Sequence, residues 1–192
     1  MHPAPSVIIF TTLSGLGFGL LAFLGLGMPD VTRMVAFVFY LIGYGLAVAG
    51  LLAATFHLGN KANAAKAFSQ WRTSWLSREG VCSVAALLVM APYAMGRVFF
   101  DANWAVLGWI GAALCVATVF TTSMIYAQLK TVPRWNMGWT PALFLTHALA
   151  GGALLAGQGT IAAVLLTVLG VVLVLSWKQG DARFDETGTT LG

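Results

Sequence analysis

The stretch that decides the fold is residues 57–80, HLGNKANAAKAFSQWRTSWLSREG, which lies between two long apolar runs. Residues 34–56 read MVAFVFYLIGYGLAVAGLLAATF, and residues 81–100 read VCSVAALLVMAPYAMGRVFF. A helix rises about 1.5 Å per residue, so some 20 apolar residues span a hydrocarbon core of ~30 Å. Both runs are therefore predicted to cross a membrane, and the polar stretch between them lies at one membrane face.

The whole chain has the composition of an integral membrane protein. Of its 192 residues, 59% are hydrophobic and 8% are charged, and the mean hydropathy is +0.86. A soluble domain carries roughly 25% charged residues, and one small core cannot bury this much apolar surface. The basic residues behind the net charge of +4 lie in loops, so we attribute them to membrane orientation and expect no nucleic-acid partner.

Six segments are long and apolar enough to span the lipid bilayer. They are residues 6–27, 34–56, 81–100, 104–129, 141–158 and 160–177. We therefore predict an all-α integral membrane protein, a bundle of six transmembrane helices. Residues 1–177 form its transmembrane anchor domain, and residues 178–192 form a polar cytoplasmic tail.

Residues 63–76 are predicted to form a short helix in the membrane interface after the second span. Phe68, Trp71 and Trp75 are spaced three and four residues apart, so they share one helical face. Arg72 points elsewhere. This is the pattern of an interfacial amphipathic helix, whose apolar face lies in the boundary between headgroups and acyl chains.

The lysines and arginines are divided unevenly between the two membrane faces, eight against two. Because an excess of basic residues in short loops marks the cytoplasmic side, we expect both termini and the 57–80 loop to be cytoplasmic. The eight residues on the rich side are Lys61, Lys66, Arg72, Arg78, Lys130, Arg134, Lys178 and Arg183, and the other two are Arg33 and Arg97.

His57 and Glu79 border the polar stretch and could handle protons beside an apolar ligand. An imidazole titrates near neutral pH, and a carboxyl group partly removed from water can relay protons. The alternative is structural. Glu79, directly before the third predicted span, would then be an acid facing the helix dipole, and the loop would be an interfacial segment with snorkelling cations.

Other chemistry is poorly supported. No acidic residue is predicted in mid-membrane, which argues against a proton-coupled transporter. His147 lies within the fifth span and does not match the depth of His57, so a haem held by two histidines is not expected. We expect His147 to hydrogen-bond the backbone of a neighbouring helix instead. Cys82 and Cys115 fit no zinc or haem-attachment spacing, and no metal site is predicted.

Four blocks of sequence resemble the DmsC family, the membrane anchor subunits of dimethyl sulfoxide reductase and its relatives, which include sulfite dehydrogenase membrane subunits. The blocks are residues 1–15 (MHPAPSVIIFTTLSG), 55–60 (TFHLGN), 68–80 (FSQWRTSWLSREG) and 124–135 (MIYAQLKTVPRW). They occur in the family's order and spacing, and the resemblance covers nearly the whole chain. The family pattern is about eight spanning helices, two more than are predicted here.

The resemblance implies a subunit of a three-subunit molybdopterin oxidoreductase in a bacterial inner membrane. Such an anchor holds an iron–sulfur subunit and a molybdopterin catalytic subunit. It exchanges electrons between ubiquinone or menaquinone and the nearest cluster, and it carries no haem. The family's histidine and glutamate tied to quinol binding match His57 and Glu79. The candidate residues around the quinone head are His57, Glu79, Ser77, Arg78, Arg72 and Trp75.

Within this class, a cytoplasmic quinone site favours the relatives that oxidise sulfite and reduce quinone. One alternative is the anchor of a dimethyl sulfoxide reductase, which oxidises quinol. An alternative of another class is a small membrane transporter or a structural membrane protein. Co-purification with an iron–sulfur protein would separate the two classes.

Overall fold

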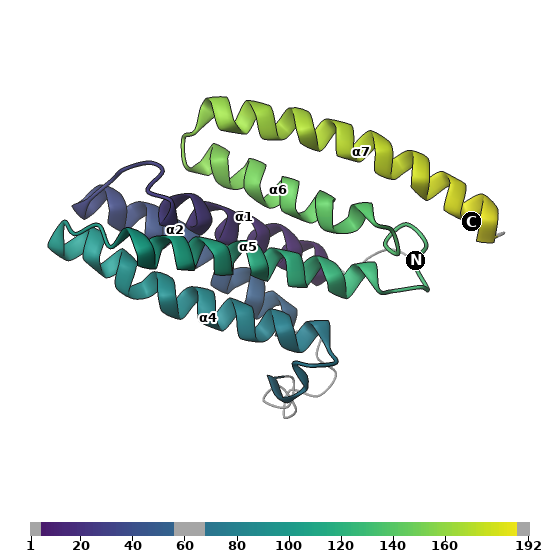
Figure 1. Cartoon of the computed structure of the whole chain (residues 1–192), viewed down its shortest axis with the longest axis horizontal. Helices are drawn as coiled ribbons and strands as arrows, with labels where there is room; N and C mark the ends of the chain where they lie inside the picture. Colours follow the sequence, from purple (N-terminus) through teal and green to yellow (C-terminus); the bar gives the residue numbers. More distant parts are fainter. Residues whose placement is uncertain (1–4, 56–67, 188–192) are drawn as a thin grey trace.

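The computed structural model describes residues 5–55 and 68–187, and this part of the chain is all-helical, as predicted (Figure 1). Its α-helices are α1 (Pro5–Gly25), α2 (Arg33–Thr55), α4 (Trp75–Met95), α5 (Ala105–Ala127), α6 (Trp139–Leu155) and α7 (Gly159–Thr187). Two short helices accompany them, the 3-10 helix η2 (Phe68–Gln70) and the π-helix η3 (Gly96–Phe100), which continues α4.

The helices have the dimensions of a membrane domain. Five apolar stretches are long enough to cross a bilayer, namely α1, α2, α4 together with η3, α5 and α7. Helix α6 is apolar but has only 17 residues, and it runs back between α5 and α7 (Figure 1). The predicted bundle of six apolar helices is thus confirmed, with the fifth shorter than the others.

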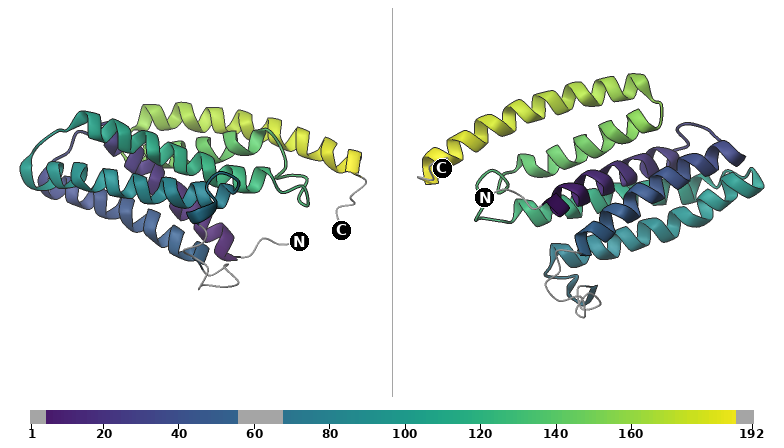
Figure 2. Two further views of the ribbon diagram at one scale, coloured as in Figure 1. Left: turned by 60° about the horizontal axis from the view of Figure 1, so that its bottom comes forward. Right: turned by 180° about the vertical axis from the view of Figure 1, so that it is seen from behind.

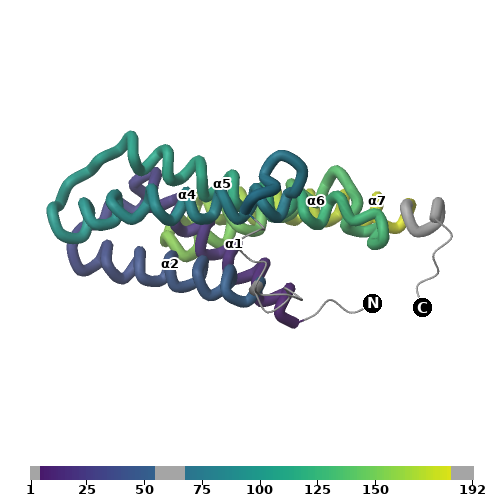
Figure 3. Tube along the Cα trace, turned by 90° about the horizontal axis from the view of Figure 1, so that it is seen from below, coloured from purple at the N-terminus to yellow at the C-terminus, as the bar shows by residue number. Residues whose placement is uncertain are grey.

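Helix α1 is the central element of the bundle. It packs against α2, α5 and α6, and in the view from below it passes between α2 and α5 (Figure 3). Helix α4 packs along α5, whereas α7 lies at the edge of the bundle and packs along α6 (Figure 2). The side chains of α1 are accordingly buried along most of its second half, including Phe18, Leu20, Leu21 and Leu24.

Glycines allow the backbones of α1 and its neighbours to approach closely. A Cβ atom added to Gly19 would collide with the carbonyl of Ala148 on α6, and one added to Gly152 would collide with the backbone of Gly19. Because lipid supplies no hydrophobic force between helices, their association depends on such close packing. The contact between α1 and α6 therefore requires glycine on both sides.

Two helix ends depend on glycines with positive φ. Gly27 has φ 76°, its N–H donates to the Leu24 carbonyl (2.9 Å), and the N–H of Met28 donates to the Phe23 carbonyl (2.9 Å). This Schellman arrangement satisfies the last carbonyls of α1. Gly157, with φ 68°, ends α6 in the same way, which turns the chain into α7.

Two helix boundaries differ from the prediction. Helix α4 begins at Trp75 rather than at 81, because Ser74 provides an N-cap whose side-chain oxygen accepts from the N–H of Ser77 (3.5 Å). Helix α7 continues past 177 to Thr187. Its polar continuation is held by an ion pair of 2.6 Å between Asp181 and Arg134 of the loop between α5 and α6.

The stretch predicted as an interfacial helix, 63–76, also differs. Residues 63–67 lie outside the described residues. After η2 the chain turns, and the extended backbone of Ser74 (φ −115°, ψ 124°) separates this turn from α4, so no continuous helix connects them. The side chains of Phe68 and Trp71 are 47% and 55% exposed, as expected of aromatic residues at a membrane interface.

The contact between α1 and α6 can be tested with two matched substitutions. Gly19→Ala would push the two helices apart and should lower the free energy of unfolding by about 1–3 kcal/mol. Gly45→Ala on α2 is the control, because no described atom lies within 4 Å of the Cβ that it adds. It should be neutral or slightly stabilising, since alanine favours helix over glycine. Thermal unfolding of the protein in detergent measures both, and equal melting temperatures would contradict the packing argument.

Candidate functional site

A buried carboxyl group lies between α4 and α5, near the ends of these helices that face the 57–80 loop. Glu79 is only 5% exposed, and its Oε1 lies 2.6 Å from the hydroxyl of Thr122 on α5. Because α4 begins at Trp75, Glu79 belongs to the second turn of the helix and does not precede it. The predicted role of Glu79 as a helix-start acid is therefore wrong, since Ser74 is the residue that caps α4.

The hydrogen bonds of Thr122 show how this pair can hold a proton. The Thr122 hydroxyl lies within hydrogen-bond distance of Glu79 and also 2.9 Å from the carbonyl of Thr118. A hydroxyl has one proton and can donate to only one of these acceptors. Both contacts are satisfied together when the carboxyl of Glu79 carries a proton and donates it to Thr122.

Two other predicted site residues stabilise the start of α4. The guanidinium of Arg78 lies 4.2 Å above the Trp75 ring and donates to the carbonyls of Trp71 (2.9 Å) and Arg72 (2.7 Å). Trp75 in turn meets Phe120 of α5 edge-on, with ring centroids 6.2 Å apart. The donors of Arg78 thus connect the turn after η2 to α4.

The remaining predicted residues differ in their surroundings. Ser77 is 1% exposed, and its hydroxyl has no hydrogen-bond partner among the described residues. Arg72 is exposed, and its contact with this region runs through its carbonyl, which accepts from Arg78. His57 lies outside the described residues, so its predicted proximity to Glu79 stays a prediction.

A cavity of about 400 Å³ lies on the other side of Thr122, among α1, α5, α6 and α7. This volume is within the range of small-molecule pockets, about 300–1,000 Å³. Most of its wall is apolar, with hydroxyls, an imidazole and a guanidinium at intervals. Its lining includes Thr11, Thr12, Ser14, Gly15, Thr122, Arg134, Trp135, Thr140, Phe144 and His147.

Aromatic side chains form the wall of the cavity that lies towards the loop between α5 and α6. Trp135 and Phe144 line the cavity, and Tyr126 packs behind both of them. The Tyr126 ring stacks on Phe144 and meets Trp135 edge-on, with ring centroids 5.2 Å apart in each pair. The cavity therefore has a rigid apolar wall close to the end of the bundle where polar residues begin.

His147 contributes a ring nitrogen to this cavity. Its Nδ1 lies 2.8 Å from the carbonyl of Leu143, one turn earlier on the same helix. The predicted bond to a neighbouring helix is therefore wrong. Because a carbonyl can only accept, Nδ1 carries the proton, and in the neutral ring Nε2 is an acceptor. Among the described residues, no group of three or more histidine, cysteine, aspartate or glutamate side chains could hold a metal ion.

The sequence analysis missed Thr122 and the cavity. A signal was present, because Thr118, Thr121, Thr122 and Ser123 lie together inside an otherwise apolar span, and all four are buried. Threonine and serine can bond to their own helix backbone, and three of these hydroxyls do so in the ordinary way. Composition therefore could not distinguish Thr122, which reaches another helix.

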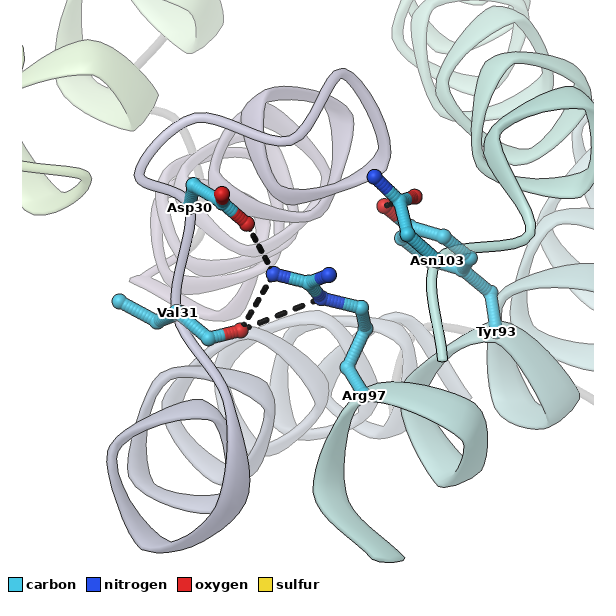
Figure 4. A network of polar contacts seen from close by, with 5 residues as sticks. All are labelled: Asp30, Val31, Tyr93, Arg97 and Asn103. Carbon is cyan, nitrogen blue, oxygen red and sulfur yellow. Dashed lines mark hydrogen bonds and ion pairs between the residues drawn. The ribbon is translucent and has the colours of Figure 1, made fainter. Parts of the chain in front are cut away.

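A second polar network lies at the opposite end of the bundle (Figure 4). The guanidinium of Arg97, in η3, forms an ion pair with Asp30 and donates to the carbonyl of Val31 from Nη2 (2.9 Å) and Nε (3.2 Å). The hydroxyl of Tyr93 donates to the side chain of Asn103 nearby (3.3 Å). Arg97 thus connects the loop between α1 and α2 to the end of α4.

A bundle of apolar helices with one buried carboxyl beside an internal cavity defines a multi-pass membrane protein with a site inside its membrane domain. A family model described as "DMSO reductase anchor subunit (DmsC)" matches residues 1–178. The chain belongs to this family, which confirms the resemblance seen in the sequence. It is a membrane anchor subunit of an oxidoreductase complex.

Two curated relatives are similar over most of the chain. It is 33% identical to a sulfite dehydrogenase subunit of Allochromatium vinosum over 223 residues, covering 98% of this chain and 68% of that protein. It is 28% identical to anaerobic dimethyl sulfoxide reductase chain YnfH of Escherichia coli over 169 residues, covering 78% of this chain and 55% of the relative. No solved structure gives a significant match.

Arg97 offers a stability prediction for the far end of the bundle. Arg97→Met leaves the Val31 carbonyl without its donor and should destabilise the protein by about 1.5–3 kcal/mol, as expected for hydrogen bonds from a charged group. Arg33→Met is the matched control, because Arg33 is exposed at the same end. It should change stability by less than about 0.5 kcal/mol. Chemical denaturation in detergent compares the two, and equal effects would show that the buried network contributes little.

Proposed function

We propose that this chain is the quinone-reactive subunit of a cytoplasm-facing sulfite dehydrogenase. It would accept electrons from an iron–sulfur partner subunit, which receives them from a molybdopterin catalytic subunit. A quinone of the membrane pool, ubiquinone or menaquinone, is then the electron acceptor. Each turnover combines one quinone with two electrons and two protons and releases one quinol.

The observation that carries this proposal is the likeness to the sulfite dehydrogenase subunit along 98% of the chain. A relative of that description at 33% identity supports sulfite as the substrate of the catalytic partner. The weaker likeness to the dimethyl sulfoxide reductase chain supports a second candidate, an anchor that oxidises quinol. Both candidates place the same chemistry, two electrons and two protons per quinone, in this subunit.

The buried pair of Glu79 and Thr122 supports proton handling. A quinone takes up protons when it is reduced, so the membrane domain needs a group that holds a proton away from bulk water. Glu79 is buried yet lies in the second turn of α4, near the polar end of the bundle. Ionisable residues inside membrane domains commonly mark such pathways. His57, on the polar side of Glu79 in the sequence, would pass protons from the aqueous phase.

The residues around the cavity fit a quinone. Its head is a planar ring with two carbonyl oxygens and needs hydrogen-bond donors, whereas its isoprenoid tail needs an apolar path. Hydroxyl, imidazole and aromatic side chains line the cavity between α1 and α6. Thr12 and His147, which are both exposed, also line it, so it reaches the outer surface of the bundle, where a tail could enter lipid.

The proposed orientation predicts the location of two loops. Reporter proteins fused after Asp101 and after Lys178 should report opposite sides of the inner membrane, with the second on the cytoplasmic side. The physical reason is the eight-to-two division of lysine and arginine. Signals from the same side would contradict the six-helix topology, whereas a reversed pair would contradict only the orientation.

The proposed proton pathway predicts the behaviour of two variants of the assembled complex. Glu79→Gln and His57→Ala should each reduce quinone-linked turnover by roughly 100-fold, the scale of a lost proton-transfer group. Turnover with a soluble dye that bypasses the membrane subunit should remain, as should co-purification of the partner subunits.

Lys130→Gln is a suitable control, because it removes a charge from the same polar end of the chain without touching Glu79. Normal quinone kinetics in both Glu79→Gln and His57→Ala would remove this pathway. Sulfite oxidation by the purified complex tests the substrate separately, and quinol-dependent reduction of dimethyl sulfoxide would favour the second candidate.

A further inference from the structure

We infer that the cavity among α1, α5, α6 and α7 is the binding site of the quinone head, with Thr122 and His147 as its polar contacts. This inference rests on the proposed function, because it takes quinone as the substrate. It differs from the sequence prediction, which placed the head among residues 57–79. In the structure the donors of Arg78 are taken up by the backbone of the preceding turn, and the space for a ligand lies behind Thr122.

The cavity matches the shape and polarity of a quinone head. Its volume of about 400 Å³ is bounded by the rigid aromatic side chains Trp135 and Phe144. The threonine and serine hydroxyls on α1 donate to carbonyls of their own helix, as Ser14 does to Phe10 (2.6 Å), so their protons are not available to a ligand. The imidazole of His147 and the hydroxyl of Thr122 are the groups whose bonding can change.

Thr122 connects this cavity with the buried carboxyl. It is the residue that lines the cavity and also contacts Glu79, which does not line the cavity itself. A proton on Glu79 therefore reaches a ligand in the cavity by way of Thr122. We assign Thr122 as a positioning residue, because it holds the carboxyl towards the cavity.

His147 gives the opposite wall a group that can accept or donate. With Nδ1 bonded to Leu143, Nε2 is left for a ligand. The neutral ring accepts a hydrogen bond from a quinol hydroxyl, and the protonated ring donates to a quinone carbonyl. One imidazole can thus bind both redox forms of the head, which an exchangeable substrate requires.

Gly15 provides a way to fill the cavity without disturbing the helix contacts. It lines the cavity, and a Cβ added there would meet only the Cβ of Ala148, at an ordinary distance of 3.8 Å. A leucine at this position would extend into the open volume. Gly45→Leu is the matched control, because an added Cβ there has no described neighbour within 4 Å.

The experiment uses membranes that contain the full complex and a short-chain ubiquinone carrying a photoreactive azide on its ring. After illumination, mass spectrometry locates the labelled peptides. Label is expected in residues 11–18, 119–122 or 140–148, and an excess of unlabelled short-chain ubiquinone should displace it. Label confined to 57–80, or label that excess phospholipid displaces and quinone does not, would overturn the inference.

The cavity variants supply the second measurement. Gly15→Leu should reduce labelling by at least about tenfold and raise the KM for quinone, whereas Gly45→Leu should behave as the unmodified chain. Thr122→Val should lower kcat for quinone more than it changes KM, and Thr122→Ser, which restores the hydroxyl, should recover the loss. Co-purification and dye-linked turnover establish that each variant assembles.

The two proposals fail in different ways. If Glu79→Gln abolishes quinone turnover while Gly15→Leu and Thr122→Val retain normal labelling and kinetics, the cavity is not the site and the proposed function stands. If the chain takes up no quinone label at all and Glu79→Gln is also without effect, the inference falls together with the proposed function.

Discussion

The close contact of α1 with its neighbours is the constraint on which the rest of the structure depends. Gly19 and Gly152 bring the backbones of α1 and α6 together at a distance that no side chain could occupy. In a membrane, where lipid is as apolar as the helices, such contacts replace the hydrophobic effect as the source of association. The cavity lies on the side of this contact towards the start of α1, where larger side chains line the two helices.

The two ends of the bundle have different physical characters. At one end Arg97 is buried and uses its guanidinium to hold the loop between α1 and α2, which closes that end. At the other end polar groups lie next to open volume, and Glu79 is bonded to a single hydroxyl from another helix. A rigid closed end and a polar end with a cavity suit a subunit whose ligand and protons enter from one side.

Burial determines what Glu79 can do. A carboxyl group without water needs a partner, and Thr122 provides one that can exchange roles between donor and acceptor. A stronger partner such as an arginine would hold the charged form and prevent proton release. The arginine next to Glu79 in the sequence, Arg78, is instead turned towards Trp75 and the preceding backbone. This separation leaves the carboxyl with a neutral partner.

Much of the fold could be predicted from sequence, because spanning a bilayer demands long apolar runs and leaves polar residues only at the ends. The six helices and the family blocks were found in this way. Helix boundaries were less certain. The start of α4 depended on the capping geometry of Ser74, and the extension of α7 depended on the pairing of Asp181 with Arg134, which is distant in sequence.

The sequence by itself determined that the chain lies in a membrane, which family it belongs to, and that Glu79 is a residue of interest. Only the tertiary structure decided which groups surround that carboxyl. Thr122 and His147 are ordinary residues in apolar helices, and nothing in their spacing shows that one reaches Glu79 and both line a cavity. Such partners depend on the relative rotation and depth of packed helices, which the contacts of α1 determine and local periodicity does not encode.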